Sequence, residues 1–242
     1  MQKRVSTYTF RDGLRGGIPI ALGYVSVSFG FGILAASGGL SAVKAALISL
    51  TNITSAGQLA GLNIILAAGG MIELISAEFV INIRYALMSI SLTQKLDASF
   101  TTLPRLFCAF CMTDEVFGVA SSRKGLIGKR YFYGLMSLPI LGWVAGTFAG
   151  ASAGYFLPES LRAAMGILLY AMFVAIVLPP ATKDRAIALC ATISVALSLL
   201  IHWIPALSGI SSGFSVIICA VLSAVVVAWV RPVKDEEGDD QK

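Results

Sequence analysis

Apolar residues occur along the chain in blocks of about 20, the length of an α-helix that crosses the hydrocarbon core of a bilayer. Short polar or basic stretches, often containing proline or glycine, separate these blocks. The pattern predicts an all-α integral membrane protein with about eight transmembrane helices, and with seven as the alternative. The predicted spans are residues 17–36, two spans within 41–92 that separate near Gly69-Gly70, 102–120, 131–155, 161–178 ending at Pro179-Pro180, 184–204 ending at Pro205, and 212–230.

The composition supports a membrane location. Of 242 residues, 57% are hydrophobic and 13% are charged, with a mean hydropathy of +0.83, whereas soluble domains have about 25% charged residues. We therefore expect a single transmembrane domain over residues 1–232 and a charged, disordered cytoplasmic tail over 233–242. Pro19 with Gly23-Tyr24, and Pro139 with Gly142-Trp143, each open a glycine-rich span, which is consistent with an internal repeat.

The net charge of +5 does not indicate nucleic-acid binding, because the basic residues form short clusters between apolar blocks. Basic loops of a membrane protein face the cytoplasm, so eight helices would place both termini there. Arg84, Lys95 and Arg105 disagree with this topology. Either Arg84 lies inside the membrane or residues 41–92 are not two simple spans. The clusters that agree are Lys3-Arg4 with Arg11 and Arg15, Arg123-Lys124 with Lys129-Arg130, Lys183 with Arg185, and Arg231 with Lys234.

Enzyme and metal motifs are few. The four cysteines do not form a disulfide framework, the single histidine excludes a histidine-rich metal site, and we expect no cofactor. The sequence contains neither a P-loop nor H-E-x-x-H. G-x-S-x-G occurs at Gly150–Gly154 and at Gly209–Gly213, where Ser211 follows His202 by nine residues. An intramembrane serine hydrolase is thus an alternative, although that motif requires a strand–turn–helix context.

The most informative stretch is Thr113-Asp114-Glu115, inside the apolar run 102–120. A charge at the centre of a membrane helix costs roughly 2.5–3.5 kcal/mol on insertion scales, so it is kept only where it is paired, hydrated or functional. Successive helical residues point about 100° apart. We therefore expect one carboxylate to face a polar interior and the other to meet a neighbouring helix or loop.

The two preceding spans are also polar. Thr51, Ser55 and Gln58 would share one face of the second helix, and Glu78 and Asn82 lie one turn apart on the third. A long Arg84 side chain could reach a carboxylate, so Arg84 with Asp114 or Glu115 is the predicted buried ion pair. Carboxylates, an arginine and amides at the membrane midplane are typical of a transporter. The alternative is a channel-like or structural subunit in which the same groups only hold helices together.

In combination, five motifs resemble the AzlC family, the large subunits of bacterial branched-chain amino acid exporters. The resemblance covers about the first two-thirds of the chain. The motifs are Pro19 with Gly23-Tyr24 and Phe29-Gly30, Ser55-Ala56-Gly57-Gln58, Asn82-Ile83-Arg84-Tyr85, Thr113-Asp114-Glu115, and Gly142-Trp143 with Gly146-Thr147.

The resemblance implies export of branched-chain or similar hydrophobic amino acids from the bacterial cytoplasm across the inner membrane, together with a small membrane partner of the AzlD type. A secondary, proton-coupled mechanism is the expected one, since no ATPase motif is present. In this mechanism a carboxylate binds the substrate ammonium or exchanges a proton, and the amides and the arginine orient the substrate carboxylate. The predicted substrate- or ion-binding residues are Asp114, Glu115, Gln58, Asn82, Arg84, Glu78, Thr113 and Ser55.

Overall fold

The computed structural model describes residues 6–154, 156–158, 160, 164, 167, 171, 174, 177–207 and 209–231. Within these residues the structure is helical, with no strand beyond an isolated bridge between Leu96 and Ile127. The predicted all-α membrane fold is therefore confirmed. The helices are α1 (Phe10–Ser37), α2 (Ala42–Thr51), α3 (Ser55–Leu66), α4 (Met71–Thr93), α5 (Thr102–Phe110), α6 (Asp114–Ser121), α7 (Lys129–Ala153), α9 (Arg185–Trp203), the short 3-10 helix η1 (Pro205–Leu207) and α10 (Ser212–Val230).

Among the described residues, four helices are long and apolar enough to cross a bilayer: α1, α7, α9 and α10. The last two match the predicted spans 184–204 and 212–230 closely. Asp184 caps α9, with its Oδ1 accepting the Ala186 N–H at 2.7 Å. α1 begins at Phe10, before the predicted start at residue 17, because Thr9 and Asp12 form a capping box there. The tail 233–242 lies outside the described residues, and the count of about eight spans remains a prediction.

Two of the predicted spans are not continuous helices. The run 102–120 forms α5 and α6 with an interruption at residues 111–113, and the span that starts near residue 41 forms α2 and α3 with an interruption at 52–54. The expected break at Gly69-Gly70 is confirmed, since α3 ends at Leu66 and α4 begins at Met71. The helical turn at 177–183 continues through Pro179-Pro180, so the predicted stop there is wrong. Proline is tolerated in membrane helices because neighbouring groups satisfy the freed backbone atoms. Most of 161–178 lies outside the described residues.

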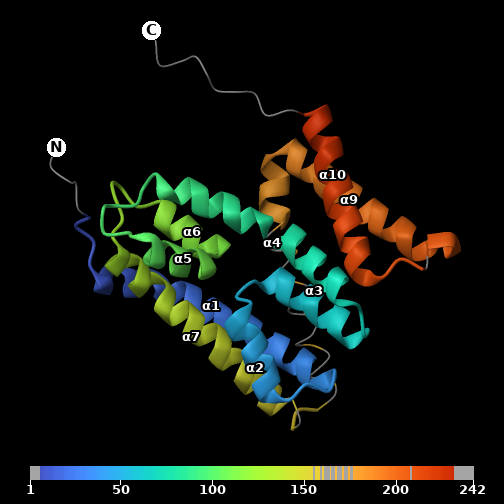
Figure 1. The fold of residues 1–242 in the computed structure, drawn as a ribbon. Helices are drawn as coiled ribbons and strands as arrows, with labels where there is room; N and C mark the ends of the chain where they lie inside the picture. The colour runs from blue at the N-terminus through green and yellow to red at the C-terminus, as the bar shows by residue number, and fades with distance from the viewer. Residues whose placement is uncertain are drawn as a thin grey trace. The chain divides into compact units, whose positions relative to one another are not determined.

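The chain divides into two compact units, Met1–Leu62 with Ile81–Met172, and Asn63–Val80 with Phe173–Lys242. In the first unit, α1 and α7 lie side by side along their lengths (Figure 1). They run parallel, because Gly13 approaches the backbone of Tyr131 and Gly32 approaches that of Thr147. A Cβ atom at either glycine would overlap a carbonyl oxygen, so small residues are required for this contact. If both helices cross the membrane, an odd number of crossings must lie between them.

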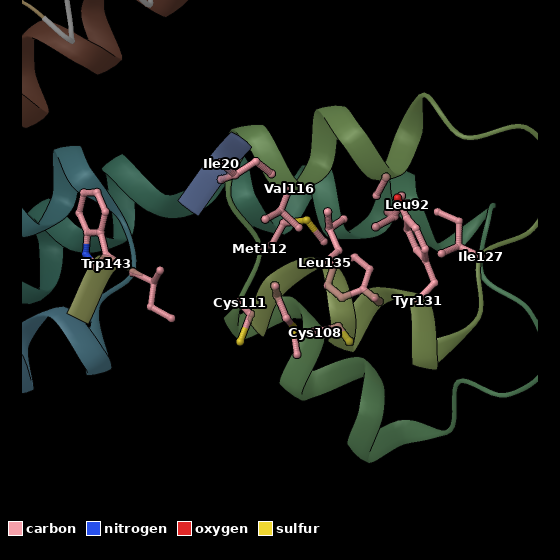
Figure 2. Close-up of a cluster of buried hydrophobic side chains, with 14 of the residues drawn as sticks. Ile20, Leu92, Cys108, Cys111, Met112, Val116, Ile127, Tyr131, Leu135 and Trp143 are labelled. Carbon is pink, nitrogen blue, oxygen red and sulfur yellow. The ribbon is translucent and has the colours of Figure 1, made fainter. Parts of the chain in front are cut away.

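The largest buried cluster of the first unit surrounds the start of α7. It includes residues from both sides of the interruption between α5 and α6, and Figure 2 shows Met112 and Val116 beside Leu135 of α7. Tyr131, Phe132 and Leu135 are fully buried. The interruption is thus held on one side by apolar packing, which fixes where the neighbouring carboxylates lie.

In the second unit, α9 and α10 pack as a hairpin, and the Ser194 hydroxyl donates to the Ser223 hydroxyl at 2.7 Å. At the start of α10, Glu73 Oε1 accepts the Gly213 N–H at 2.9 Å and the Ser211 hydroxyl at 2.5 Å. Glu73 is only 7% exposed. A buried carboxylate is stabilised there because the N-terminus of a helix carries partial positive charge. The sequence showed that Glu73 lies in the third span but not that it caps the last helix.

Candidate functional site

The carboxylates Asp114 and Glu115 form the first turn of α6 instead of lying in the middle of a long helix. Thr113 has extended backbone angles, and its hydroxyl accepts the Val116 N–H at 3.3 Å, so it is the N-cap. The prediction of one continuous helix over 102–120 is therefore wrong. Threonine favours the cap position, and acidic residues favour the first turn because of the helix dipole. Together these preferences outweigh continuation of the apolar run.

Asp114 forms an ion pair with Arg84 of α4. Arg84 Nη1 lies 2.9 Å from Oδ2 and 3.0 Å from Oδ1 of Asp114, and Arg84 Nη2 donates to the Tyr85 hydroxyl at 2.8 Å. The predicted pairing of Arg84 with this acidic pair is confirmed. The side chains are 40% and 32% exposed, so the pair is half-exposed and not buried as expected. If this pair lies within the membrane, its open side must meet water or another polar group.

Glu115 points to a different partner. The Tyr24 hydroxyl of α1 donates to Glu115 Oε2 at 2.5 Å. The Tyr24 ring is buried and packs edge-on against Trp143 of α7, with ring centroids 5.1 Å apart. The expectation that the two carboxylates would have different surroundings is confirmed. Tyr24 and Trp143 belong to the motifs that carry the family resemblance, but no local sequence pattern indicates that Tyr24 binds a carboxylate.

An apolar cavity of about 350 Å³ lies between α4 and α5 and reaches the α5–α6 interruption at Met112. Its α4 wall begins at Ser89, five residues after Arg84, which is roughly 7.5 Å further along the helix axis. The cavity and the ion pair are thus neighbours along α4, but neither Arg84 nor Asp114 lines the cavity. The other lining residues are Ile90, Leu92, Thr93, Leu96, Phe100, Thr102, Arg105, Leu106, Cys108, Ala109 and Phe132.

The interruption between α2 and α3 carries a different kind of polar group. Gln58 is fully buried, and its Nε2 donates to the Ser49 hydroxyl at 2.5 Å while its Oε1 accepts the Trp143 indole N–H at 2.8 Å. The Ser49 and Thr147 hydroxyls share a hydrogen bond of 2.6 Å. This network joins α2, α3 and α7, and both ends of the Gln58 amide have partners within the protein.

The predicted polar stripe of Thr51, Ser55 and Gln58 on one helix is wrong, because the helix is interrupted between the first two residues. Thr51 is exposed and its hydroxyl donates to the Leu47 carbonyl of its own helix, whereas Ser55 begins α3 and is half-buried. The Thr54 hydroxyl donates to Asn52 Oδ1 at 2.5 Å. Asparagine and threonine also have low helix propensity, which favours an interruption here.

The remaining predicted residues lie on α4, where Glu78 and Asn82 are half-buried one turn apart. Asn82 precedes Arg84 by two residues and belongs with it to the first unit, while Glu78 belongs to the second. The structure therefore brings together Arg84, Asp114, Glu115 and Thr113. Gln58 belongs to a separate network, in which it accepts the hydrogen bond of the Trp143 indole. No cluster of three or more histidine, cysteine or acidic side chains suited to a metal ion occurs within the described part of the chain.

The hydrolase motifs have no supporting geometry. Gly150 to Ala153 lie inside α7, so that G-x-S-x-G is part of a continuous helix. Ser211 is the N-cap of α10 and donates its hydroxyl to Glu73. Neither motif follows a strand in the residues that the structure describes. The strand–turn–helix context that this chemistry needs is absent from both places.

Comparison with known proteins gives a consistent result. A family model described as "AzlC protein" matches residues 19–157, which contain all eight predicted site residues and exclude α9 and α10. An uncharacterised membrane protein of Archaeoglobus fulgidus is 34% identical, over 70% of this chain and 75% of that protein. The inner membrane protein YgaZ of Escherichia coli is 27% identical, over 94% of both chains. The branched-chain amino acid transport protein AzlC of Bacillus subtilis is 24% identical, over 76% of this chain and 73% of that protein. No solved structure matches the chain.

Proposed function

Because the chain belongs to the AzlC family and is a membrane transport protein, we propose that it exports branched-chain or similar hydrophobic amino acids. In this proposal it is a secondary, proton-coupled transporter of the bacterial cytoplasmic membrane, and it works with a small partner of the AzlD type. The name of the Bacillus subtilis relative supports the substrate class. The chain would form one transmembrane transporter domain with both termini in the cytoplasm.

The observation that carries this proposal is the charged group at the α5–α6 interruption. Arg84, Asp114 and Glu115 combine one cation and two carboxylates at a helix break, with the ion pair half-exposed. A free amino acid carries one ammonium and one carboxylate. An interrupted membrane helix is a common place for transporters to bind such a substrate, because unsatisfied backbone groups and side chains meet there.

Each group has a role that follows from its chemistry. Asp114 accepts the substrate ammonium or a coupling proton, and Arg84 then receives the substrate carboxylate when its bond to Asp114 is replaced. The Tyr24 hydroxyl orients Glu115, which is a second carboxylate able to accept the ammonium or a proton. The apolar cavity that begins at Met112 accepts the aliphatic side chain. Thr113 fixes the turn through its cap, and Asn82, two residues before Arg84 in the same unit, adds an amide. Glu78 and Ser55 have no part in this arrangement.

The experiment compares efflux of labelled leucine from loaded cells that contain the chain and its small partner. Asp114→Asn removes the charge and keeps the shape, so efflux should fall at least tenfold while membrane abundance and assembly stay unchanged. Asp184→Asn is the matched control, because it makes the same change at the exposed cap of α9, where asparagine also caps well. This control should export normally.

The alternative is a channel-like or structural subunit, and the fully engaged Gln58 network is the observation that favours it. Under that alternative, Asp114→Asn lowers assembly before it lowers flux per assembled complex. Unchanged efflux at normal abundance would remove Asp114 from the transport cycle. Proton coupling is tested separately, because an imposed pH gradient should change the rate of the unmodified protein and not that of Asp114→Asn.

A further inference from the structure

A second hollow, of about 740 Å³, lies where α1 and α7 begin. Its lining contains more polar and basic side chains than that of the apolar cavity. Arg11 comes from the first turn of α1, and Lys129 and Arg130 come from the first turn of α7. The other lining residues of the hollow are Ser6, Thr7, Tyr8, Thr9, Phe10, Asp97, Ser99 and Gly128.

The charge of the hollow is strongly one-sided. Arg11, Lys129 and Arg130 carry three positive charges, and no ion pair engages them within the described residues. Asp97 carries the one negative charge of the lining, which leaves a net charge of 3 − 1 = +2. Asp97 is only 4% exposed, and its carboxylate accepts hydrogen bonds from Ser6 and Ser99, so it offers little open surface to a ligand. The accessible surface of the hollow is therefore cationic.

Hydrogen bonds to Asp97 also hold the segments that line the hollow in fixed positions. Asp97 Oδ2 accepts the Ser6 N–H at 2.9 Å, and Asp97 Oδ1 accepts the Ser99 N–H at 2.8 Å and the Ser99 hydroxyl at 2.5 Å. The same Ser99 hydroxyl oxygen accepts the Lys129 N–H at 3.0 Å. The segment before α1, the loop before α5 and the start of α7 are thus joined through one carboxylate. The three cations are held on fixed backbone, not on a free tail.

The position of the hollow indicates what would fill it. α1 and α7 are both candidate membrane spans, they run parallel, and both begin at the hollow. A helix of 28 residues is about 42 Å long, whereas the hydrocarbon core is about 30 Å thick. α1 is thus long enough for one end to reach the lipid headgroups, and the basic first turns of α1 and α7 favour the end at the hollow. Tyr8 lines the hollow and stacks beside Arg123 and Tyr131, as aromatic side chains do at a membrane interface.

We propose that this hollow binds a phosphate group, and that the phosphate belongs to the headgroup of an anionic lipid. Arg11, Lys129 and Arg130 supply the cations, and the Thr7 hydroxyl supplies a hydrogen-bond donor, whereas the Thr9 hydroxyl already donates to Asp12. A phosphate diester in this position is attracted by several charges at once, and its acyl chains can lie along the exposed apolar faces of α1. The lipid then fixes the start of α1 against α7. The inference depends on membrane insertion but not on the transported substrate or the partner.

The test uses the full chain purified in detergent, with phosphatidylglycerol and phosphatidylcholine as the lipid probes. Bound lipid is counted by native mass spectrometry, and the unfolding temperature is measured during titration. Phosphatidylglycerol should stay bound and raise the unfolding temperature, and phosphatidylcholine should do neither. The combined variant Arg11→Gln, Lys129→Gln, Arg130→Gln should lose at least tenfold in apparent affinity for phosphatidylglycerol.

The matched control is Lys44→Gln, Lys183→Gln, Arg185→Gln, which removes the same charge from exposed positions outside the hollow. This control should bind phosphatidylglycerol within twofold of the unmodified chain. Equal retention of both lipids, or equal loss in both variants, would overturn the proposal. Inorganic phosphate and glycerol 3-phosphate form a separate arm. If they raise the unfolding temperature as much as phosphatidylglycerol does, the ligand is a soluble phosphate and the lipid assignment is wrong.

Discussion

The first unit contains two interrupted helices, and the polar groups at the two interruptions differ in burial and in hydrogen bonding. At the α2–α3 interruption, Gln58 is buried and each end of its amide is bonded to another side chain. At the α5–α6 interruption, Asp114 and Arg84 bond each other but remain half-exposed. A fully satisfied buried network fixes a structure, whereas exposed charges at membrane depth need a further partner.

The comparison shows that a helix break is not by itself evidence of a binding site. What separates the two places is charge, exposure and the neighbouring cavity. Met112 lines an apolar cavity next to the α5–α6 interruption, while the α2–α3 interruption is closed by Ser49, Thr147 and Trp143. We therefore expect substitutions at the α2–α3 interruption to change stability. Substitutions at the α5–α6 interruption should instead change transport.

The largest expected effect on folding comes from Gln58→Leu. The substitution leaves the Trp143 indole N–H without its acceptor, while Ser49 keeps its bond to Thr147, and a buried unsatisfied group costs about 1–3 kcal/mol. The free energy of unfolding in detergent should fall by that amount, while transport per folded complex stays the same. Asn63→Leu is the control, because Asn63 is an exposed amide on the same helix. A loss of transport with unchanged stability would place Gln58 in the substrate path and break the comparison.

A smaller effect is expected from Tyr24→Phe. This change removes the hydrogen bond to Glu115 and keeps the ring that packs on Trp143. One hydrogen bond to a partly solvated carboxylate contributes about 1 kcal/mol, so transport should slow about fivefold with little change in unfolding temperature. Tyr133→Phe is the control, since its ring packs on Phe107 away from the carboxylates. Equal rates in both variants would show that Glu115 needs no fixed orientation.

The smallest effect concerns Asp97. This residue should affect how stability depends on pH but not how transport depends on pH. Burial alone raises the pKa of the Asp97 carboxyl, but the hydrogen bonds from Ser99 and Ser6 outweigh it, and the pKa lies below the ordinary value of 3.8. A carboxyl with a lowered pKa in the folded state stabilises the protein above about pH 4, and this contribution disappears as the pH falls through the folded-state pKa.

Asp97→Asn should therefore lower the unfolding temperature by a few degrees at neutral pH, and the difference from the unmodified protein should shrink below about pH 4. Thermal unfolding across this range measures the difference. Transport that changes between about pH 5 and 8 should change equally in Asp97→Asn, because Asp97 does not titrate there. A pH profile of transport that shifts in this variant would contradict the structural role of Asp97.

The sequence alone determined the features that depend on local composition. Blocks of apolar residues predicted the membrane helices, Gly69-Gly70 predicted the start of α4, and Asp184 and Pro205 bounded α9. The charges Arg84, Asp114 and Glu115 stood out because charges are costly within apolar runs. Thr113 followed by two acidic residues is also a local signal for a helix start. It was outweighed by the length of the apolar run, which by itself predicted a single crossing.

Tertiary structure decided which polar groups are satisfied. Tyr24 and Glu115 are 91 residues apart, and Gln58 and Trp143 are 85 apart, so no local pattern could pair them. The parallel contact of α1 with α7 brings Tyr24 beside Trp143 and so separates the two sets of polar groups. Residue type determined that these side chains needed partners. Only the packing of distant helices determined that Gln58 has all of its partners within the protein while Asp114 and Arg84 remain partly open.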